Sequence, residues 1–337
     1  NGQGKIRRKM LIPDSAHGTN PATAAMAGYE VVEVKSGKDG NMDMIDFMSK
    51  LNPEVAGIMT TQPSTLGLFE INIFRITEAL HRNGSLVYGD GANMNAFLGK
   101  VKPADLGIDV MHINTHKALT TPHGGGGPGA GPVMVTKQLA DFLPDPVVVK
   151  DPKTGMYKFE RPNDTIGKLN GWYGNVAVLE RAYSYIRTMG EDGLRAVSEN
   201  AVLNANYLKV GLSEDYPLQF GADRRNMHEV VIEGAPIGHK LGKHPNIDVA
   251  KRLIDYGFHP PTMSFPLIAE DALMIEPTET ESKESLDMFI AAMKAIAQEA
   301  RETPEVLKSA PHFTPVGRLD ETKAARKPEL RWKPQQG

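Results

Sequence analysis

At positions 110–117 the chain reads Val110-Met111-His112-Ile113-Asn114-Thr115-His116-Lys117. The first four residues form an apolar run that is typical of a short buried strand, and polar residues follow at once. Lys117 is therefore predicted to lie where a parallel strand gives way to a loop, and open α/β sheets bind their ligands at that point. The glycine-rich loop from Pro122 to Pro132 comes next, and its backbone could approach a small ligand without obstruction by side chains. These features indicate an amine held close to a ligand, although most lysines are solvated and most glycine runs are flexible connections.

Around this segment the sequence alternates strand-like and helix-like stretches, which is typical of a mostly parallel sheet with helices on both faces. We expect right-handed crossovers and one doubly wound layer. Strands are predicted at Lys9–Pro13, Glu30–Val34, Glu54–Thr60, Ser85–Gly89, Val110–Ile113 and Gly131–Val135. Helices are predicted at Pro21–Gly28, Met42–Leu51 and Ile71–Asn83.

Polar residues follow four of the predicted strands directly. If these strands are parallel, their carboxyl ends meet at one edge of the sheet, so the polar residues would form one site from separate pieces of the chain. The four sets are Asp14–Asn20, Thr61–Thr65, Asp90–Asn93 and Asn114–Lys117.

Two of these polar residues suit a ligand with an aromatic ring. Asp90 could hold a proton on a ligand nitrogen, because an ion pair in a shielded cleft favours the charged form of both groups. The pair Asp-Gly is also common turn chemistry. His17 could lie flat on an aromatic ring, or it could be a loop histidine that is satisfied by the backbone. His116 is predicted to point to the face opposite Lys117 and to serve packing or a phosphate group.

The composition argues against several classes of function. The 337 residues include 38 lysines and arginines against 41 aspartates and glutamates, for a net charge of −3, and neither sign forms a long block. Nucleic acid and anionic membranes are therefore not expected partners. No run approaches the ~18 apolar residues of a membrane span, and the polar start is unlike a signal peptide. The chain has no cysteine, which excludes a disulfide, a thiolate nucleophile and a cysteine-ligated metal.

A metal site is not predicted. His17, His112, His116 and His123 are close in sequence, but none belongs to a His-Glu-x-x-His pair on a helix. The glycine run also lacks the Gly-Lys-Ser/Thr ending of a phosphate-binding loop.

The second half of the chain is predicted to form a smaller α+β lobe. We expect a large domain that carries the ligand site at residues 1–165 and bridging helices at residues 166–215. A small domain is expected at residues 216–302, and a loose tail at residues 303–337. Helices are predicted at Asn175–Met189, Gly193–Leu212, Ile247–Tyr256 and Ser282–Arg301, and strands at His228–Ile232 and Ala272–Ile275. Pro144–Asp164 has the composition of a surface excursion. Glu276-Pro277-Thr278-Glu279 is predicted to be a turn that caps the next helix.

Taken together, these segments resemble the glycine cleavage system P-protein family, and in particular its lysine-bearing second subunit. The similarity covers almost the whole chain, and the motifs occur in the same order. They are Asp14–Pro21, Thr65–Glu70, Asp90–Asn93, His116-Lys117 with Pro122–Gly129, and Ile275–Ser282. Relative to this family the chain is expected to be shortened at its N-terminus, and Gln62 stands where the family usually has asparagine.

The resemblance implies a pyridoxal phosphate (PLP) enzyme of the fold type I transferases, with a mostly parallel α/β sheet and a smaller C-terminal α+β domain. It implies catalytic roles for Lys117, which would carry the cofactor covalently, and for His17, which would stack on the cofactor ring. Asp90 would pair with the pyridine nitrogen, and Ala92 would contact the other face of the ring.

The resemblance also implies roles for the residues beside Lys117. Thr115 and His116 would reach toward the cofactor phosphate. The substrate channel would be bordered by a loop of five residues, His123, Gly124, Gly125, Gly126 and Gly127.

By the same resemblance, the reaction is decarboxylation of glycine, with transfer of the aminomethyl group to the oxidised lipoyl arm of the H-protein. The activity would be that of an oxidoreductase of glycine catabolism, glycine dehydrogenase (aminomethyl-transferring). The expected partners are glycine, the lipoylated H-protein and subunit 1 of the P-protein, in a heterotetramer with two copies of each subunit. The expected location is the cytoplasm, or the mitochondrial matrix in a eukaryote. The alternatives are another fold type I PLP decarboxylase or aminotransferase, and a non-catalytic partner subunit.

Overall fold

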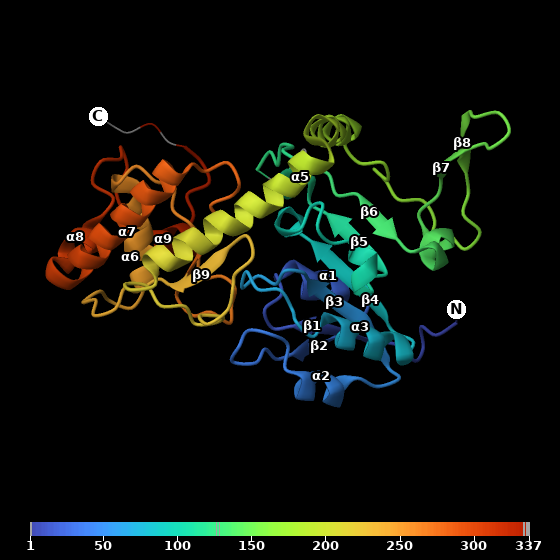
Figure 1. Ribbon diagram of the computed structural model, residues 1–337, viewed down its shortest axis with the longest axis horizontal. Helices are drawn as coiled ribbons and strands as arrows, with labels where there is room; N and C mark the ends of the chain where they lie inside the picture. The colour runs from blue at the N-terminus through green and yellow to red at the C-terminus, as the bar shows by residue number, and fades with distance from the viewer. Residues whose placement is uncertain (1, 126, 128, 333, 335–337) are drawn as a thin grey trace.

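A six-stranded sheet forms the centre of the larger lobe in the computed structural model (Figure 1), which describes residues 2–125, 127, 129–332 and 334. The strand order is β2-β1-β3-β4-β5-β6, and all neighbouring strands are parallel except β5 and β6. The strands are β1 (Lys9–Pro13), β2 (Glu30–Val34), β3 (Val55–Thr61), β4 (Leu86–Gly91), β5 (Val110–Ile113) and β6 (Val133–Val135). The predicted mostly parallel sheet is confirmed, and β1, β2 and β5 have the predicted bounds.

Helices cover both faces of this sheet, because alternate residues of each strand point to opposite sides. The helices are α1 (Thr19–Met26), α2 (Met44–Lys50) and α3 (Ile73–Arg82). On one face, Phe47 of α2 and Ile76 of α3 pack into the main core with Ile58 of β3. On the other face, Ala24 of α1 packs with Met59, the next residue of β3. The doubly wound arrangement is thus built from the alternation of apolar residues along the strands.

A long helix, α5 (Val176–Leu212), runs from the larger lobe to the smaller one (Figure 1). Gly190 interrupts its helical geometry, with φ 62° and ψ −171°, so that α5 consists of two helical segments. Glycine takes this conformation at little steric cost. The sequence predicts two helices that are separated at this point, and the structure confirms this.

The smaller lobe contains a three-stranded antiparallel sheet in the order β10-β11-β9, covered by helices. Its elements are β9 (Val230–Glu233), α6 (Pro245–Asp255), β10 (Thr262–Met263), β11 (Ala272–Ile275), α7 (Lys283–Glu302) and α8 (Pro304–Ser309). Leu253, Ile296 and Leu307 lie in its core. Because Leu307 and Ala310 are fully buried, the lobe continues through α8, past the predicted boundary at residue 302.

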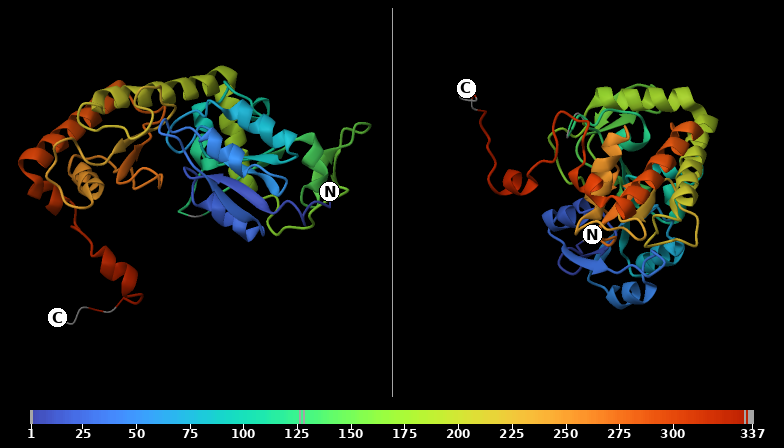
Figure 2. Two further views of the ribbon diagram at one scale, coloured as in Figure 1. Left: turned by 90° about the horizontal axis from the view of Figure 1, so that it is seen from below. Right: turned by 90° about the vertical axis from the view of Figure 1, so that its left-hand side faces the viewer.

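Several elements were not predicted. The surface excursion contains a hairpin that projects away from the sheet (Figure 1), and the C-terminal segment with α9 extends away from the small lobe (Figure 2). The hairpin consists of β7 (Val147–Lys150) and β8 (Tyr157–Glu160), and α9 is Glu321–Arg326. The other short elements are η1 (Met94–Ala96), η2 (Pro103–Leu106), α4 (Thr115–Ala118) and η3 (Lys137–Phe142). Among the residues that the structure describes, no helix is both long enough and apolar enough to cross a membrane.

Gly67 marks a tight contact between the lobes. A Cβ at this position would lie 2.1 Å from the carbonyl oxygen of Glu229, and φ is +70°. A methyl group therefore requires backbone movement in addition to a strained dihedral angle. We expect Gly67→Ala to lower the free energy of unfolding by about 3 kcal/mol, measured by denaturant titration.

The matched control for this variant is Gly28→Ala. Gly28 has φ +87°, but a Cβ there would meet nothing within 4 Å. The control isolates the cost of positive φ, which is about 1 kcal/mol. Equal losses in the two variants would show that the contact with Glu229 is not tight.

Candidate active site

A cavity of about 630 Å³ lies between the two lobes at the carboxyl ends of the parallel strands. The cavity is lined by residues of the small lobe and by residues at the ends of β3, β4 and β5 or in the loops that follow β1, β3, β4 and β5. The lining residues from the large lobe are His17, Thr19, Asn20, Thr61, Thr65, Asp90, Ala92, Asn93, His112, Asn114, Lys117 and His123. The prediction that the four polar sets converge is confirmed.

Asp90 lies near the end of β4, and it is only 6% exposed. Its Oδ1 accepts a hydrogen bond from the backbone N–H of Ala92 (3.0 Å) and lies 3.3 Å from Nε2 of His112. Its Oδ2 accepts hydrogen bonds from Asn20 Nδ2 (3.3 Å) and Thr61 Oγ1 (3.5 Å). Amide and hydroxyl donors orient a carboxylate without cancelling its charge, so Asp90 can still pair with a cationic group of a ligand.

Tyr88 orients the imidazole of His112. Burial raises the pKa of Tyr88 to about 12, with a further contribution from the Asp90 carboxylate, so the phenol keeps its proton. Its oxygen lies 2.6 Å from Nδ1 of His112 and can donate to it. In the corresponding tautomer Nε2 carries the proton and faces Asn114 Oδ1 (3.0 Å) and Asp90 Oδ1 (3.3 Å). The Nε2–H of His112 thus bonds to Asn114, and His112 is a close polar neighbour of the Asp90 carboxylate.

Lys117 belongs to α4, the single helical turn that follows β5, and it lines the same cavity as Asp90. Elsewhere on the cavity wall, Nδ1 of His17 accepts a hydrogen bond from the backbone N–H of Thr19 (3.1 Å), which restrains the ring. The ring of Phe265, from the small lobe, has its centroid 5.5 Å from that of His17. The structure brings together Lys117, Asp90, His17, Ala92 and His123 of the predicted site residues.

The other predicted site residues lie outside the cavity wall. Thr115 is fully buried, and its hydroxyl donates to the carbonyl of Ala130 (3.2 Å) and accepts from Thr121 (2.8 Å). His116 packs edge-on against His123, with ring centroids 4.5 Å apart, and burial lowers its pKa. The exposed glycines Gly124, Gly125 and Gly127 do not line the cavity, and Gly126 lies outside the described residues.

The small lobe contributes two acidic residues that the sequence reasoning did not place in the site. Glu229 precedes β9 and Glu276 follows β11, and both line the cavity. The predicted capping role of the segment that begins at Glu276 is wrong, because Oγ of Ser282 accepts a hydrogen bond from the N–H of Ser285 (3.2 Å) and caps α7. The sequence does not show that β9 and β11 pair, and it is the register of this pairing that brings Glu229 and Glu276 together.

Proteins of known family are highly similar to this sequence. A protein of Caldanaerobacter subterraneus subsp. tengcongensis, named probable glycine dehydrogenase (decarboxylating) subunit 2, is 57% identical over 330 residues, which cover 97% of this chain and 67% of that protein. This chain belongs to the glycine dehydrogenase (decarboxylating) subunit 2 family. A protein of the same name from Chlorobium chlorochromatii is 55% identical, with 96% of this chain and 66% of that protein covered. The chain thus spans about two thirds of the length of these members of the family.

Further comparisons agree with this family and show its fold. Residues 197–312 match the family model for the glycine dehydrogenase C-terminal domain, and residues 5–146 match aminotransferase class-V. A crystal structure of glycine decarboxylase (P-protein) of the glycine cleavage system, in inhibitor-bound form, has a TM-score of 0.69 at 21% identity and covers 86% of this chain and 66% of its own. A cysteine desulfurase from Thermococcus onnurineus NA1 has a TM-score of 0.64 at 18% identity, with 86% and 72% covered. The predicted fold class is confirmed.

Proposed function

We propose that this member of the glycine dehydrogenase (decarboxylating) subunit 2 family catalyses PLP-dependent decarboxylation of glycine and transfers the aminomethyl group to the lipoyl arm of the H-protein. The observation that carries this proposal is that Asp90, near the end of β4, and Lys117, just after the neighbouring strand β5, line one cavity together with the imidazole of His17. An amine, a carboxylate and a flat ring around a space of this size suit an aromatic aldehyde.

The residues in the cavity fit PLP. Lys117 would hold the cofactor through its amine, Asp90 would pair with the ring nitrogen, and His17 and Ala92 would contact the ring. When bound, the cofactor supplies an electron-accepting ring for the electron pair that the departing carboxyl group leaves behind. Thr115 is not part of this proposal, because its only hydroxyl proton is donated to the carbonyl of Ala130 and the side chain is fully buried.

The protein's own contribution is to orient groups and to hold protons. Asp90 would keep the ring nitrogen protonated, because a buried carboxylate favours the charged form of its partner. Hydrogen bonds from Asn20, Thr61 and the backbone N–H of Ala92 hold that carboxylate in position. Phe265 lines the cavity from the small lobe, and its apolar ring would help to exclude water from a bound ligand.

The partners follow from the reaction. The aminomethyl group is accepted by a lipoyl arm that belongs to another protein, the H-protein, and subunit 1 of the P-protein would complete a heterotetramer with two copies of each subunit. A cytoplasmic location, which the sequence predicts, is part of the same proposal.

The test is exchange of the carboxyl carbon of glycine with labelled bicarbonate, in the presence of PLP, subunit 1 and the lipoylated H-protein. We expect label to enter glycine at a rate that depends on the H-protein. Transamination of an amino acid without exchange would contradict the proposal and favour an aminotransferase of the same fold.

A further inference from the structure

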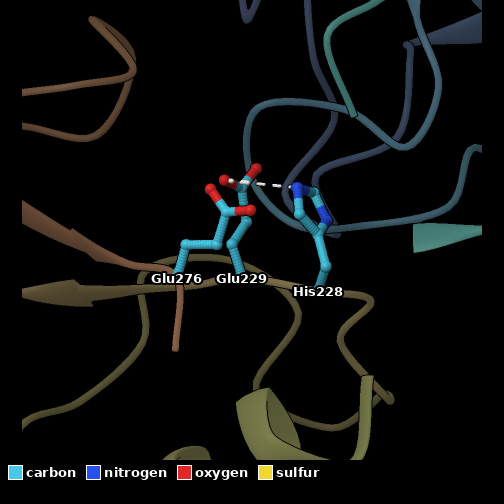
Figure 3. Close-up of side chains that lie close together, drawn as sticks. All are labelled: His228, Glu229 and Glu276. Carbon is cyan, nitrogen blue, oxygen red and sulfur yellow. Dashed lines mark ion pairs between the residues drawn. The ribbon is translucent and has the colours of Figure 1, made fainter. Parts of the chain in front are cut away.

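Two glutamates lie opposite each other at the ends of the neighbouring strands β9 and β11. Ile275 pairs with Val230 in the antiparallel register of β11 and β9, so the next position along sets Glu276 opposite Glu229. Figure 3 shows the two carboxyl groups close together, beside the imidazole of His228. Each of the three residues offers a nitrogen or oxygen atom, and these atoms lie within 4.8 Å of one another. Like charges at opposite positions are destabilising, so two full negative charges are not expected here.

The surroundings of the two carboxyl groups favour a proton on the pair. Glu229 is only 3% exposed, and among the described residues its Oε1 has no hydrogen-bond partner. Glu276 is open to the cavity, and its Oε1 accepts a hydrogen bond from Asn95 Nδ2 (2.8 Å). A buried, ionised carboxylate without a partner is costly, and protonation removes that cost.

Lys117 lines the same cavity as the two glutamates, and its positive charge acts on them, whereas His228 carries no charge near pH 7. Burial lowers the pKa of His228 to about 3, with a contribution from Lys117, so its imidazole is neutral near pH 7. Its contact with Glu229, 3.7 Å from Nε2 to Oε2 and dashed in Figure 3, is then not an ion pair. Burial raises the pKa of both glutamates, and the Glu276 carboxylate raises that of Glu229 further, while the charge of Lys117 opposes these effects. The other titratable groups that line the cavity are Asp90, His17, His112 and His123.

We propose that Glu229 and Glu276 act as one unit that holds a single proton, and that the remaining negative charge of this unit is the counter-ion of the Lys117 amine. When the amine loses its proton, the unit accepts it. The N–H bond breaks with its electron pair left on nitrogen, and an O–H bond forms on the second carboxyl group. Lys117 becomes a neutral nucleophile, and the charge of the group of three residues stays balanced.

This inference rests on the proposed function only in taking Lys117 as the reactive amine. Its test is therefore made on the full chain without cofactor, so that it is independent of decarboxylation. The reaction of Lys117 with acetic anhydride, a small neutral reagent, is followed over a pH series by peptide mass spectrometry. The variants are Glu229→Gln, Glu276→Gln and the double variant, with the exposed Glu281→Gln as control.

A shared proton predicts a non-additive result. Each single variant keeps one ionised carboxylate, so the midpoint of Lys117 labelling should move by less than ~0.3 pH unit. The double variant removes the negative charge, so its midpoint should fall by about one pH unit, which is about tenfold faster labelling below the midpoint. Equal shifts in both single variants that add up in the double variant would mean two independent charges. No shift in the double variant would mean no coupling to Lys117. Either result would overturn the proposal.

A second measurement keeps the test valid if a glutamine variant does not fold. Lys117→Met removes the positive charge and leaves both glutamates in place. In infrared difference spectra we expect an additional protonated carboxyl signal in this variant, because the unit takes up its second proton. An unchanged carboxyl signal would contradict the proposal. Wild-type labelling that Mn²⁺ alters and a chelator restores would also overturn it, by showing that the three ligand atoms hold a metal ion instead.

Discussion

Replacing Lys117 by alanine is expected to reduce bicarbonate exchange into glycine by at least ~10³-fold. The amine is the group in the cavity that can condense with an aldehyde, and alanine offers no nucleophile in its place. Cofactor absorbance in the visible range should be lost together with the activity, because the covalent link is lost. The measurement is the exchange rate of the reconstituted complex, with the absorption spectrum recorded on the same sample.

The matched control for Lys117→Ala is Lys100→Ala. Lys100 is an exposed lysine that pairs with Glu199 on the surface of the large lobe. Such pairs contribute about 0–1 kcal/mol, so activity and spectrum should stay unchanged. If the complex with Lys117→Ala exchanged bicarbonate at the wild-type rate, the chain would be a non-catalytic partner subunit.

Asp90→Asn is expected to lower kcat for exchange by ~10²-fold or more, with a smaller effect on the amount of bound cofactor. The amide keeps the shape of the side chain but removes the charge that would keep the ring nitrogen protonated. The absorption maximum should also shift, because the ring nitrogen would lose its proton near neutral pH. Steady-state kinetics and the absorption spectrum of the same preparation measure the two effects.

Asp109→Asn separates the role of Asp90 from the general cost of changing a buried carboxylate. Asp109 is also 6% exposed, and it accepts hydrogen bonds from the N–H of Val87 (2.8 Å) and from His81 (2.9 Å). It immediately precedes β5, so it lies at the other end of the strands from the cavity. We expect this variant to lose stability but to keep kcat. Equal losses of kcat in the two variants would contradict a specific role for Asp90.

The sheet and the large-lobe side of the cavity could be predicted because they depend on local patterns. Apolar runs such as Val110–Ile113 define the strands, and turn residues follow each strand directly. Once the strands are parallel, the positions of Asp90 and Lys117 at one edge follow from geometry. The break in α5 could also be predicted, because Gly190 disrupts an otherwise continuous helical pattern.

The remaining parts of the site depend on contacts that the sequence pattern does not contain. Glu229 and Glu276 enter the cavity because the small lobe packs against the large one, for example where Gly67 meets the backbone of Glu229. The resemblance implies that Thr115 reaches the cofactor phosphate, but α4 begins at this residue and its hydroxyl donates to the carbonyl of Ala130 in the following loop. The strands of the β7–β8 hairpin have only four residues each, which is too few to recognise an alternation of apolar and polar residues in the sequence.

The direct test of the central claim is to locate the covalently bound cofactor. The complex is loaded with PLP, reduced with borohydride, digested and analysed by mass spectrometry. We predict that the pyridoxyl mass is found on the peptide that contains Lys117. A pyridoxyl group on a different lysine, or on no lysine of this chain while the complex is active, would contradict the account.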